Sequence, residues 1–487
     1  MTISSSNSSS KQRNLGLLEK YQASKTLTQG YGSVTCTAQV RHQIQRKDNA
    51  TTFYLTQFHP AITRLVQRYP FLSLVVRDFG QSTAHFIHVS SFSLSSMIHV
   101  TTSPPPLDEA IASACDKELL STDSDTDIPP WRLHILVQPD KLDECTIIFI
   151  AHHIIIDGKS LALFWAAFLQ ELNNDNDIST TIQTSSPNKD DSWLVHTDTL
   201  APMSLPSPME LRSDIPKPSV FDYASLFGGI LKKWIPFGRQ MEFWEGDSAA
   251  VDGEAHSTMI KLRELGGDAW KMVLQLAKQK YNNISIHAVV HAAFLLAWAE
   301  IYPDQATMMT TPINCRQQAN AHLEIGNFVG VYEHAWTPDV LLNPPSSLTD
   351  DVPLVWRLAH HYHTILQTKK HRSCVGAHFL GLLDYPNGYI DYWKGIRKEH
   401  RMGRAGGLEH SDLGRFDDPG QNNPWTLDSL WFSQSAQIFS MALGLNTITL
   451  NNVMYASFVW QYGSLDEAKV TLVMDRFIDI LQHSVQQ

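Results

Sequence analysis

The stretch that decides the fold is His152–Gly158 (HHIIIDG), together with the apolar run Thr146–Ala151 (TIIFIA) that precedes it. The length and the isoleucine content of this run predict a buried β-strand. From Lys159 onward apolar residues recur at helical spacing, which predicts a helix. The two histidines therefore lie at a strand end, where side chains on a rigid scaffold commonly carry function.

A histidine at this position has the chemistry of a general base. A neutral imidazole accepts a proton near neutral pH when its second nitrogen is held by a fixed partner. One ring of the adjacent pair can face a channel while the other points into the protein. Asp157 can pair with a cation, and Gly158 leaves room for backbone or ligand. The alternative interpretation is two core histidines and an aspartate that caps a helix, and for an isolated pair it is the better one.

The composition limits the class of protein. The 487 residues can form two domains of ordinary size, and 43% of them are hydrophobic. The formal net charge is −11 and no stripe rich in Lys and Arg is present, which argues against a nucleic-acid partner. A ligand that carries phosphate stays possible, because it needs only a local basic patch.

The cysteines and the N-terminus indicate the compartment. The five cysteines are widely spaced and include no CxxC pair, which predicts buried thiols in a reducing environment. The polar, Ser-rich start has no apolar signal core, and no stretch reaches transmembrane length. We therefore expect a cytoplasmic protein, with peripheral association with lipid surfaces left open.

The pattern along the chain predicts a mixed α/β protein of two lobes. We expect a disordered tail over 1–14, an N-terminal lobe over 15–172, a crossover linker over 173–236 and a C-terminal lobe over 237–487. Periodicity predicts the following elements: a helix at Phe53–Tyr69, a strand at Trp131–Val137 that pairs with Thr146–Ala151, helices at Leu262–Lys280 and Ser285–Ile301, an extended segment at Leu380–Asp384, and a loop over Lys394–Pro424.

Two local patterns resemble known sites without matching them. Gly158–Ser160 has the GKS ending of a phosphate-binding loop, but the glycine required five positions earlier is replaced by His153. His287 and His291 have the spacing of a zinc-binding helix, but Ala288 stands where HExxH has its glutamate. We therefore expect a packed histidine pair there, and no metal site.

The HHxxxDG motif is the signature of the CoA-dependent acyltransferase superfamily, which this chain resembles. The superfamily includes peptide-synthetase condensation domains, plant-type BAHD acyltransferases and fungal alcohol acetyltransferases. Further segments that resemble it are Leu15–Gln22, Ala61–Ser73, Pro130–Leu133, Thr311–Arg316 (TPINCR), Asn327–Gly330 (NFVG), Ser411–Phe416 and Phe432–Ser435. The DFGWG motif of the plant branch is absent, so the chain looks closest to the fungal alcohol acetyltransferase branch.

The resemblance implies two chloramphenicol-acetyltransferase-like lobes, each a mostly mixed sheet flanked by helices, with a tunnel between them. His153 would be the general base, His152 a buried supporting residue, and Asp157 a structural residue paired with Arg316. Gly158 would line the passage of the donor. The candidates for stabilising the oxyanion of the tetrahedral intermediate are Ser411, Ser433 and Gln434.

Three hypotheses follow for the activity. The first is an O-acyltransferase that moves an acyl group, expected to be acetyl, from acyl-CoA to the hydroxyl of a small apolar alcohol or secondary metabolite. It would act as a monomer without a permanently bound cofactor. The second is a condensation-like enzyme that takes its acyl group from a carrier protein in trans. The third is a cyclase or binding protein that uses the same fold without acyl transfer.

Overall fold

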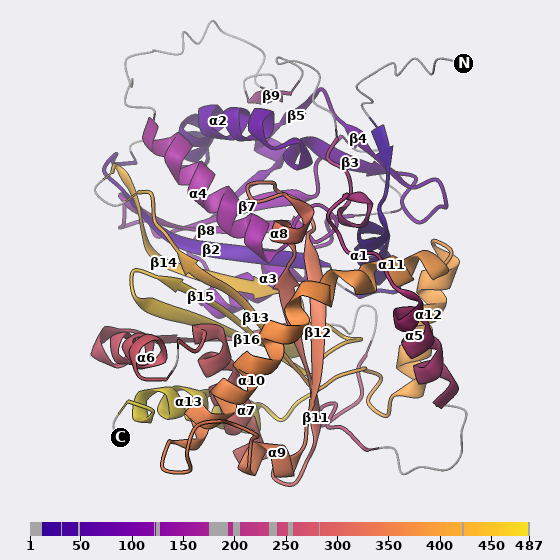
Figure 1. The fold of residues 1–487 in the computed structure, drawn as a ribbon. Coiled ribbons are helices and arrows are strands. Elements are labelled where there is room, and N and C mark those ends of the chain that lie inside the picture. Colours follow the sequence, from indigo (N-terminus) through magenta and orange to yellow (C-terminus); the bar gives the residue numbers. More distant parts are fainter. Residues whose placement is uncertain are drawn as a thin grey trace, which may run out of the picture.

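The structure is a computed structural model that describes most of the chain. The described residues are 12–30, 32–46, 49–120, 122, 127–174, 193–197, 205–232, 241–251, 257–281, 283–420 and 423–485. Two large sheets form the centre of the molecule, each covered by helices (Figure 1). Within the described ranges, no helix is both long enough and apolar enough to cross a membrane.

Within the part of the chain that the structure describes, the strands form two large and two small sheets. The five-stranded sheet has the order β14 (Trp425–Gln434), β2 (Ser33–His42), β8 (Glu144–His152), β7 (Trp131–Val137), β6 (Ile98–Thr102). The six-stranded sheet has the order β10 (Thr258–Leu265), β16 (Val453–Gln461), β15 (Leu443–Leu450), β13 (Leu408–Phe416), β11 (Thr307–Asn314), β12 (Val329–Trp336). The small sheets join β1 (Gln12–Asn14), β4 (His85–His88) and β3 (Leu74–Arg77), and β5 (Ser91–Ser93) with β9 (Leu194–His196).

The α-helices and shorter 3-10 turns connect these strands. The α-helices are α1 (Leu17–Leu27), α2 (Ala50–Arg68), α3 (Leu107–Cys115), α4 (Gly158–Asn174), α5 (Val220–Lys232), α6 (Gly267–Gln279), α7 (Ile286–Ile301), α8 (Arg316–Ala319), α9 (Pro338–Leu342), α10 (Leu354–Lys369), α11 (Gly376–Phe379), α12 (Asn387–Glu399) and α13 (Glu467–His483). The 3-10 turns are η1 (Pro70–Ser73), η2 (Leu94–Ser96), η3 (Met209–Leu211), η5 (Lys370–Val375) and η6 (Leu380–Leu382).

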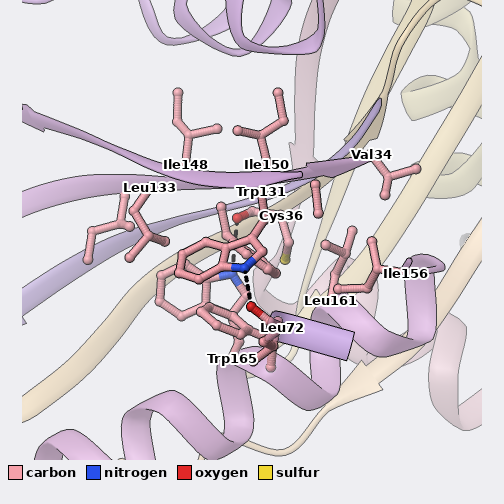
Figure 2. Packing of buried hydrophobic residues seen from close by; sticks show 14 of the residues in the cluster. Val34, Cys36, Leu72, Trp131, Leu133, Ile148, Ile150, Ile156, Leu161 and Trp165 are labelled. Carbon is pink, nitrogen blue, oxygen red and sulfur yellow. Dashed lines mark hydrogen bonds between the residues drawn. The ribbon is translucent and has the colours of Figure 1, made fainter. Parts of the chain in front are cut away.

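Strand β8 lies in the middle of the first sheet because almost every one of its side chains is buried. It pairs antiparallel with β7, as the sequence predicted, and with β2 on its other side. Helix α4 packs on this sheet through Trp165, whose indole N–H donates to the carbonyl of Cys36 at 3.0 Å. Figure 2 shows this contact beside the matching one from Trp131 to the carbonyl of Leu72, at 2.8 Å. The motif between β8 and α4 is therefore held by a rigid core.

The C-terminal half of the chain contributes one strand to the sheet of the N-terminal half. Strand β14 follows β13 of the second sheet in the chain but pairs with β2 of the first sheet, from Trp425 opposite His42 to Gln434 opposite Val34. The expected C-terminal lobe over 237–487 therefore contributes one strand to the sheet of the N-terminal lobe. The pairing of β14 with β2 places Ser433 and Gln434 in the same sheet as His152.

Several boundaries differ from those predicted. Gln12–Asn14 forms β1 against β4, so the tail expected over 1–14 is ordered at its end, while residues 1–11 lie outside the described residues. The helix expected at Leu262–Lys280 begins as strand β10, because an alternating amphipathic strand and an amphipathic helix follow each other directly. Leu380–Leu382 is a 3-10 turn where an extended segment was expected.

The loop expected over Lys394–Pro424 is the largest error. It contains the end of α12 and the whole of β13, which lies inside the second sheet between β15 and β11. Polar residues of β13 hid the strand: its sequence LEHSDLGRF looks exposed, yet its first residues are buried. Within the described residues, all five cysteines are free and buried, as expected.

Candidate active site

The HHxxxDG motif spans the end of β8 and the start of α4. Asp157 caps this helix, because its Oδ1 accepts the backbone N–H of Ser160 at 2.8 Å. The next residue is Gly158, which has no side chain. A Cβ added there would lie 2.7 Å from the side chain of Leu413 and 3.1 Å from that of Phe432. Glycine therefore lets the helix begin close against β13 and β14, and any larger residue requires Leu413 and Phe432 to shift.

The ring of His152 is buried and held at both nitrogens. Its Nδ1 accepts the backbone N–H of Ile154 at 3.0 Å, so Nε2 carries the proton and donates to Thr26 Oγ1 at 2.9 Å. Gly32 makes room for this ring, since a Cβ there would lie 2.7 Å from Nε2. Burial, and then the charges of His153 and Lys25, lower the pKa of His152 to about 3. His152 is therefore a neutral, fixed supporting residue.

His153 is held through its backbone, and its ring is partly exposed. Its N–H donates to the carbonyl of Gly32 at 2.5 Å, and its own carbonyl accepts Asn327 Nδ2 at 2.8 Å. Burial, and then the charge of Lys25, lower the pKa of His153 to about 4, against the opposing effect of Asp157. The imidazole is therefore neutral at pH 7, and one of the two nitrogens of a neutral imidazole carries a lone pair that can accept a proton. Its Nδ1 lies 3.4 Å from Asn327 Nδ2.

Asp157 and Arg316 form a buried ion pair between the two halves of the chain. Arg316 Nη1 donates to Oδ2 at 2.8 Å and Nη2 donates to Oδ1 at 2.9 Å, which is the bidentate arrangement. The backbone N–H of Phe328 donates to Oδ2 at 2.8 Å. Burial by itself would raise the pKa of Asp157, but the charge and hydrogen bonds of Arg316 outweigh it and lower the pKa. The carboxylate is fully committed to these partners and is therefore not a proton carrier.

A second set of contacts ties the same residues to the turn after α8. Ser160 Oγ donates to the carbonyl of Gly326 at 2.9 Å and accepts a hydrogen bond from Arg316. Arg316 also donates to the carbonyl of Glu324 at 3.1 Å. The start of α4 is thus bound to residues 316–328, which places Asn327 against His153.

Two cavities lie at the two ends of the motif. One, of about 370 Å³, is lined by Asp157 and Gly158 and by the side chains of Lys159, Lys370 and Ser411. The other, of about 400 Å³, is lined by Gly32 and His152 together with a charged segment at residues 116–118. His153 follows His152 and precedes Asp157 in the sequence, but it is not itself among the residues that line either cavity.

The three candidates for oxyanion stabilisation have different surroundings. Ser411 lies on β13 and lines the cavity of Gly158. Ser433 is buried on β14, and its Oγ has no hydrogen-bond partner among the described residues. Gln434 donates its Nε2 to Glu409 Oε1 at 2.6 Å, so its amide is already engaged. Of the three, Ser411 is the one that lines a described cavity, and Ser433 is the one whose buried hydroxyl has no partner among the described residues.

Sequence reasoning missed residues that position the motif. Asn327 was noticed only as part of a family-like segment, and Thr26, Gly32 and Lys25 were not singled out. Lys25 is a buried cation on α1 that donates to Gln437 at 2.7 Å. Burial lowers its pKa to about 8, against the opposing charge of Glu409. No sequence signal could find these residues, since each lies far along the chain from its partner.

Comparisons with known proteins identify the family of the chain. The model of the family described as alcohol acetyltransferase matches residues 106–483. A curated relative, the "probable alcohol acetyltransferase" of Fusarium pseudograminearum, is 23% identical over 444 residues, which cover 88% of this chain and 86% of the relative.

Solved structures share the fold at low sequence identity. The trichothecene 15-O-acetyltransferase of Fusarium sporotrichioides aligns with a TM-score of 0.67 at 14% identity, over 99% of this chain and 97% of that chain. The starter condensation domain of rhizomide synthetase, solved in complex with C8-CoA, aligns with a TM-score of 0.59 at 12% identity, over 98% of this chain and 95% of that chain. These likenesses confirm the expected mixed α/β fold of two lobes.

Proposed function

Because the chain belongs to the alcohol acetyltransferase family and is therefore an acyltransferase, we propose that it moves an acetyl group from acetyl-CoA to the hydroxyl of a small, apolar alcohol. The observation that carries the proposal is His153: a neutral, partly exposed imidazole at a strand end, with its backbone fixed from both halves of the chain. That is the requirement for a general base that acts on a hydroxyl near neutral pH.

In the proposed mechanism, His153 takes the proton of the acceptor hydroxyl as its oxygen attacks the thioester carbonyl. The carbonyl oxygen becomes an oxyanion, and the unused hydroxyl of Ser433 is the candidate to donate to it. The carbon–sulfur bond then breaks, and the imidazolium returns its proton to the thiolate. The products are the ester and CoA with a free thiol. Neither a metal ion nor a covalent enzyme intermediate takes part.

The lining of the cavity at Gly158 supports the proposal that the donor enters from that side. This lining includes the cations Lys159 and Lys370 and one further carboxylate, that of Asp412, on a chain of net charge −11. The Asp157 of this lining is paired with Arg316. Two ammonium groups suit the phosphates of CoA, and Gly158 lines the same cavity while its backbone packs closely against Leu413 and Phe432. We propose that the donor enters here, and that the acceptor approaches from the cavity at Gly32 and His152.

The proposal is tested by mass spectrometry of candidate acceptors. A panel of aliphatic, aromatic and terpenoid alcohols would be incubated with the purified protein and acetyl-CoA, octanoyl-CoA, or an acetylated carrier protein. We expect an ester product with acetyl-CoA, and none with the His153→Ala variant. Products formed only from the carrier protein would favour the condensation-like alternative, and the absence of any ester with all three donors would contradict the proposed function.

A further inference from the structure

Three histidines meet away from His153. His287 and His291 lie on α7, and His410 joins them from β13. One ring nitrogen from each can be chosen such that all three lie within 4.8 Å of one another. His291 and His410 are fully buried, and His287 lines the cavity of Gly158. The sequence argued against a metal here because it showed only two histidines and no glutamate; the third histidine comes from the segment that was mistaken for a loop.

Outer hydrogen bonds fix which nitrogen of two rings carries the proton. Thr447 Oγ1 donates its proton to Asp412 Oδ1 at 3.0 Å, so it can only accept from His410 Nε2, at 3.1 Å. His287 Nδ1 lies 3.5 Å from Asp412 Oδ2, where its N–H faces a carboxylate. The opposite nitrogens, Nδ1 of His410 and Nε2 of His287, therefore carry lone pairs. A carboxylate or hydroxyl behind a histidine in this way is the usual outer arrangement of a metal-binding imidazole.

No hydrogen-bond donor among the described residues faces the lone pairs of His410 Nδ1 and His287 Nε2. Among the described residues, His410 Nδ1, His287 Nε2 and both ring nitrogens of His291 are buried without a hydrogen-bond partner. The ring of His291 stacks on Tyr362 at 3.7 Å, which explains its packing but not its two unused polar atoms. Buried polar atoms without partners are rare because each is costly, so four in one cluster require an explanation.

We propose that His287, His291 and His410 bind one divalent transition-metal ion, of which zinc is the representative. Neutral imidazoles are good ligands for such ions, and three of them leave a fourth position for water. Of the three, His287 lines the cavity of Gly158. The rings of His287 and His410 stack in parallel, with centroids 4.4 Å apart. One of them therefore turns on binding, because bonds of about 2.0–2.1 Å require the nitrogens to converge. The site joins α7 to β13. It borders the proposed donor cavity through His287, but none of the three histidines takes part in the proposed acyl transfer at His153.

The test uses the full chain, stripped with a chelator and dialysed. Zinc sulfate would be titrated by calorimetry, bound metal counted by elemental analysis, and the melting temperature measured with and without zinc. We expect one zinc ion per chain and a rise in melting temperature of about 2–5 °C at saturating zinc. Cobalt(II) in place of zinc should give visible absorption bands of a four-coordinate site.

Matched variants locate the ion. His291→Phe keeps a ring stacked on Tyr362 but supplies no ligand, so it should fold with an unchanged or higher melting temperature without zinc and should lose both the binding and the zinc-dependent rise. His322→Asn, at an exposed histidine, should behave as the wild type. Wild-type protein that binds no stoichiometric zinc would overturn the proposal, and so would His291→Phe and His410→Leu variants that both bind zinc as the wild type does.

Discussion

Arg316 and Asp157 meet in a bidentate ion pair that joins α8 of the C-terminal half to the start of α4, and both side chains are almost fully buried. The same carboxylate caps α4 and accepts the N–H of Phe328, next to the Asn327 that holds His153. The pair therefore does not carry protons; it fixes His153, the proposed general base, relative to the second sheet.

The first prediction concerns this ion pair. Asp157→Asn keeps the shape of the side chain but leaves Arg316 buried without its counter-charge, which should cost about 3–5 kcal/mol of unfolding free energy. The matched control is Asp428→Asn, which breaks the exposed pair with Arg41 and should cost about 0–1 kcal/mol. Denaturant unfolding measures both, and equal stabilities of Asp157→Asn and the wild type would refute a structural role for the pair.

The second prediction concerns the passage of the donor. In Gly158→Val the added carbons meet Leu413 and Phe432 and narrow the cavity, so the KM for acetyl-CoA should rise far more than the KM for the alcohol. The control is Gly395→Val, at a helix position with no atom within 4 Å of an added Cβ. Melting curves of both variants separate folding from binding. Equal increases in both KM values in a folded Gly158→Val protein would place the donor elsewhere.

The third prediction is a pH dependence. The lowered pKa of His153, to about 4, means that the imidazole stays neutral well below the ordinary value of 6.5. We expect kcat/KM to stay level as pH falls to about 5.5 and to be lost as it falls through about 4. In Lys25→Met a nearby positive charge that opposes protonation is removed, so the acidic limb should move to higher pH. An acidic limb near pH 6.5 in the wild type, or no movement in Lys25→Met, would contradict this account of His153.

The fourth prediction tests Asn327 as a positioning residue. Asn327→Ala removes the donor to the carbonyl of His153, so kcat should fall about tenfold while both KM values change little. Asn343→Ala, at an exposed asparagine, is the control and should leave kcat unchanged. If Asn327→Ala instead raised KM with kcat unchanged, Asn327 would belong to the substrate site.

The sequence was sufficient for the strand, the motif and the helix, because the apolar run and the helical spacing around His152–Gly158 are local signals. The pairing of Arg316 with Asp157 was expected from the family resemblance, and the structure shows it. The strand β13 was missed because its buried polar side chains imitate a loop. The contacts of Gly32 and Asn327 with His153 were out of reach, since they join residues more than a hundred positions apart.

The cluster of His287, His291 and His410 could not be predicted either, because His410 lies far from the other two in the sequence. A helix periodicity places His287 beside His291, but only the parallel pairing of β13 with β11 and β15 brings His410 to them. The partners that make a lone histidine pair into a candidate metal site thus come from tertiary structure. A pattern along one helix contained no information about them.

The most direct test of the central claim is single-turnover and steady-state kinetics of His153→Ala with the identified alcohol and acetyl-CoA. Removing a general base should lower kcat by roughly 10²–10⁴, with a melting temperature close to that of the wild type, because the ring of His153 is partly exposed. His152→Ala, by contrast, should lower stability, since its ring is buried and hydrogen-bonded at both nitrogens. A folded His153→Ala protein with kcat near that of the wild type would show that His153 is not the base.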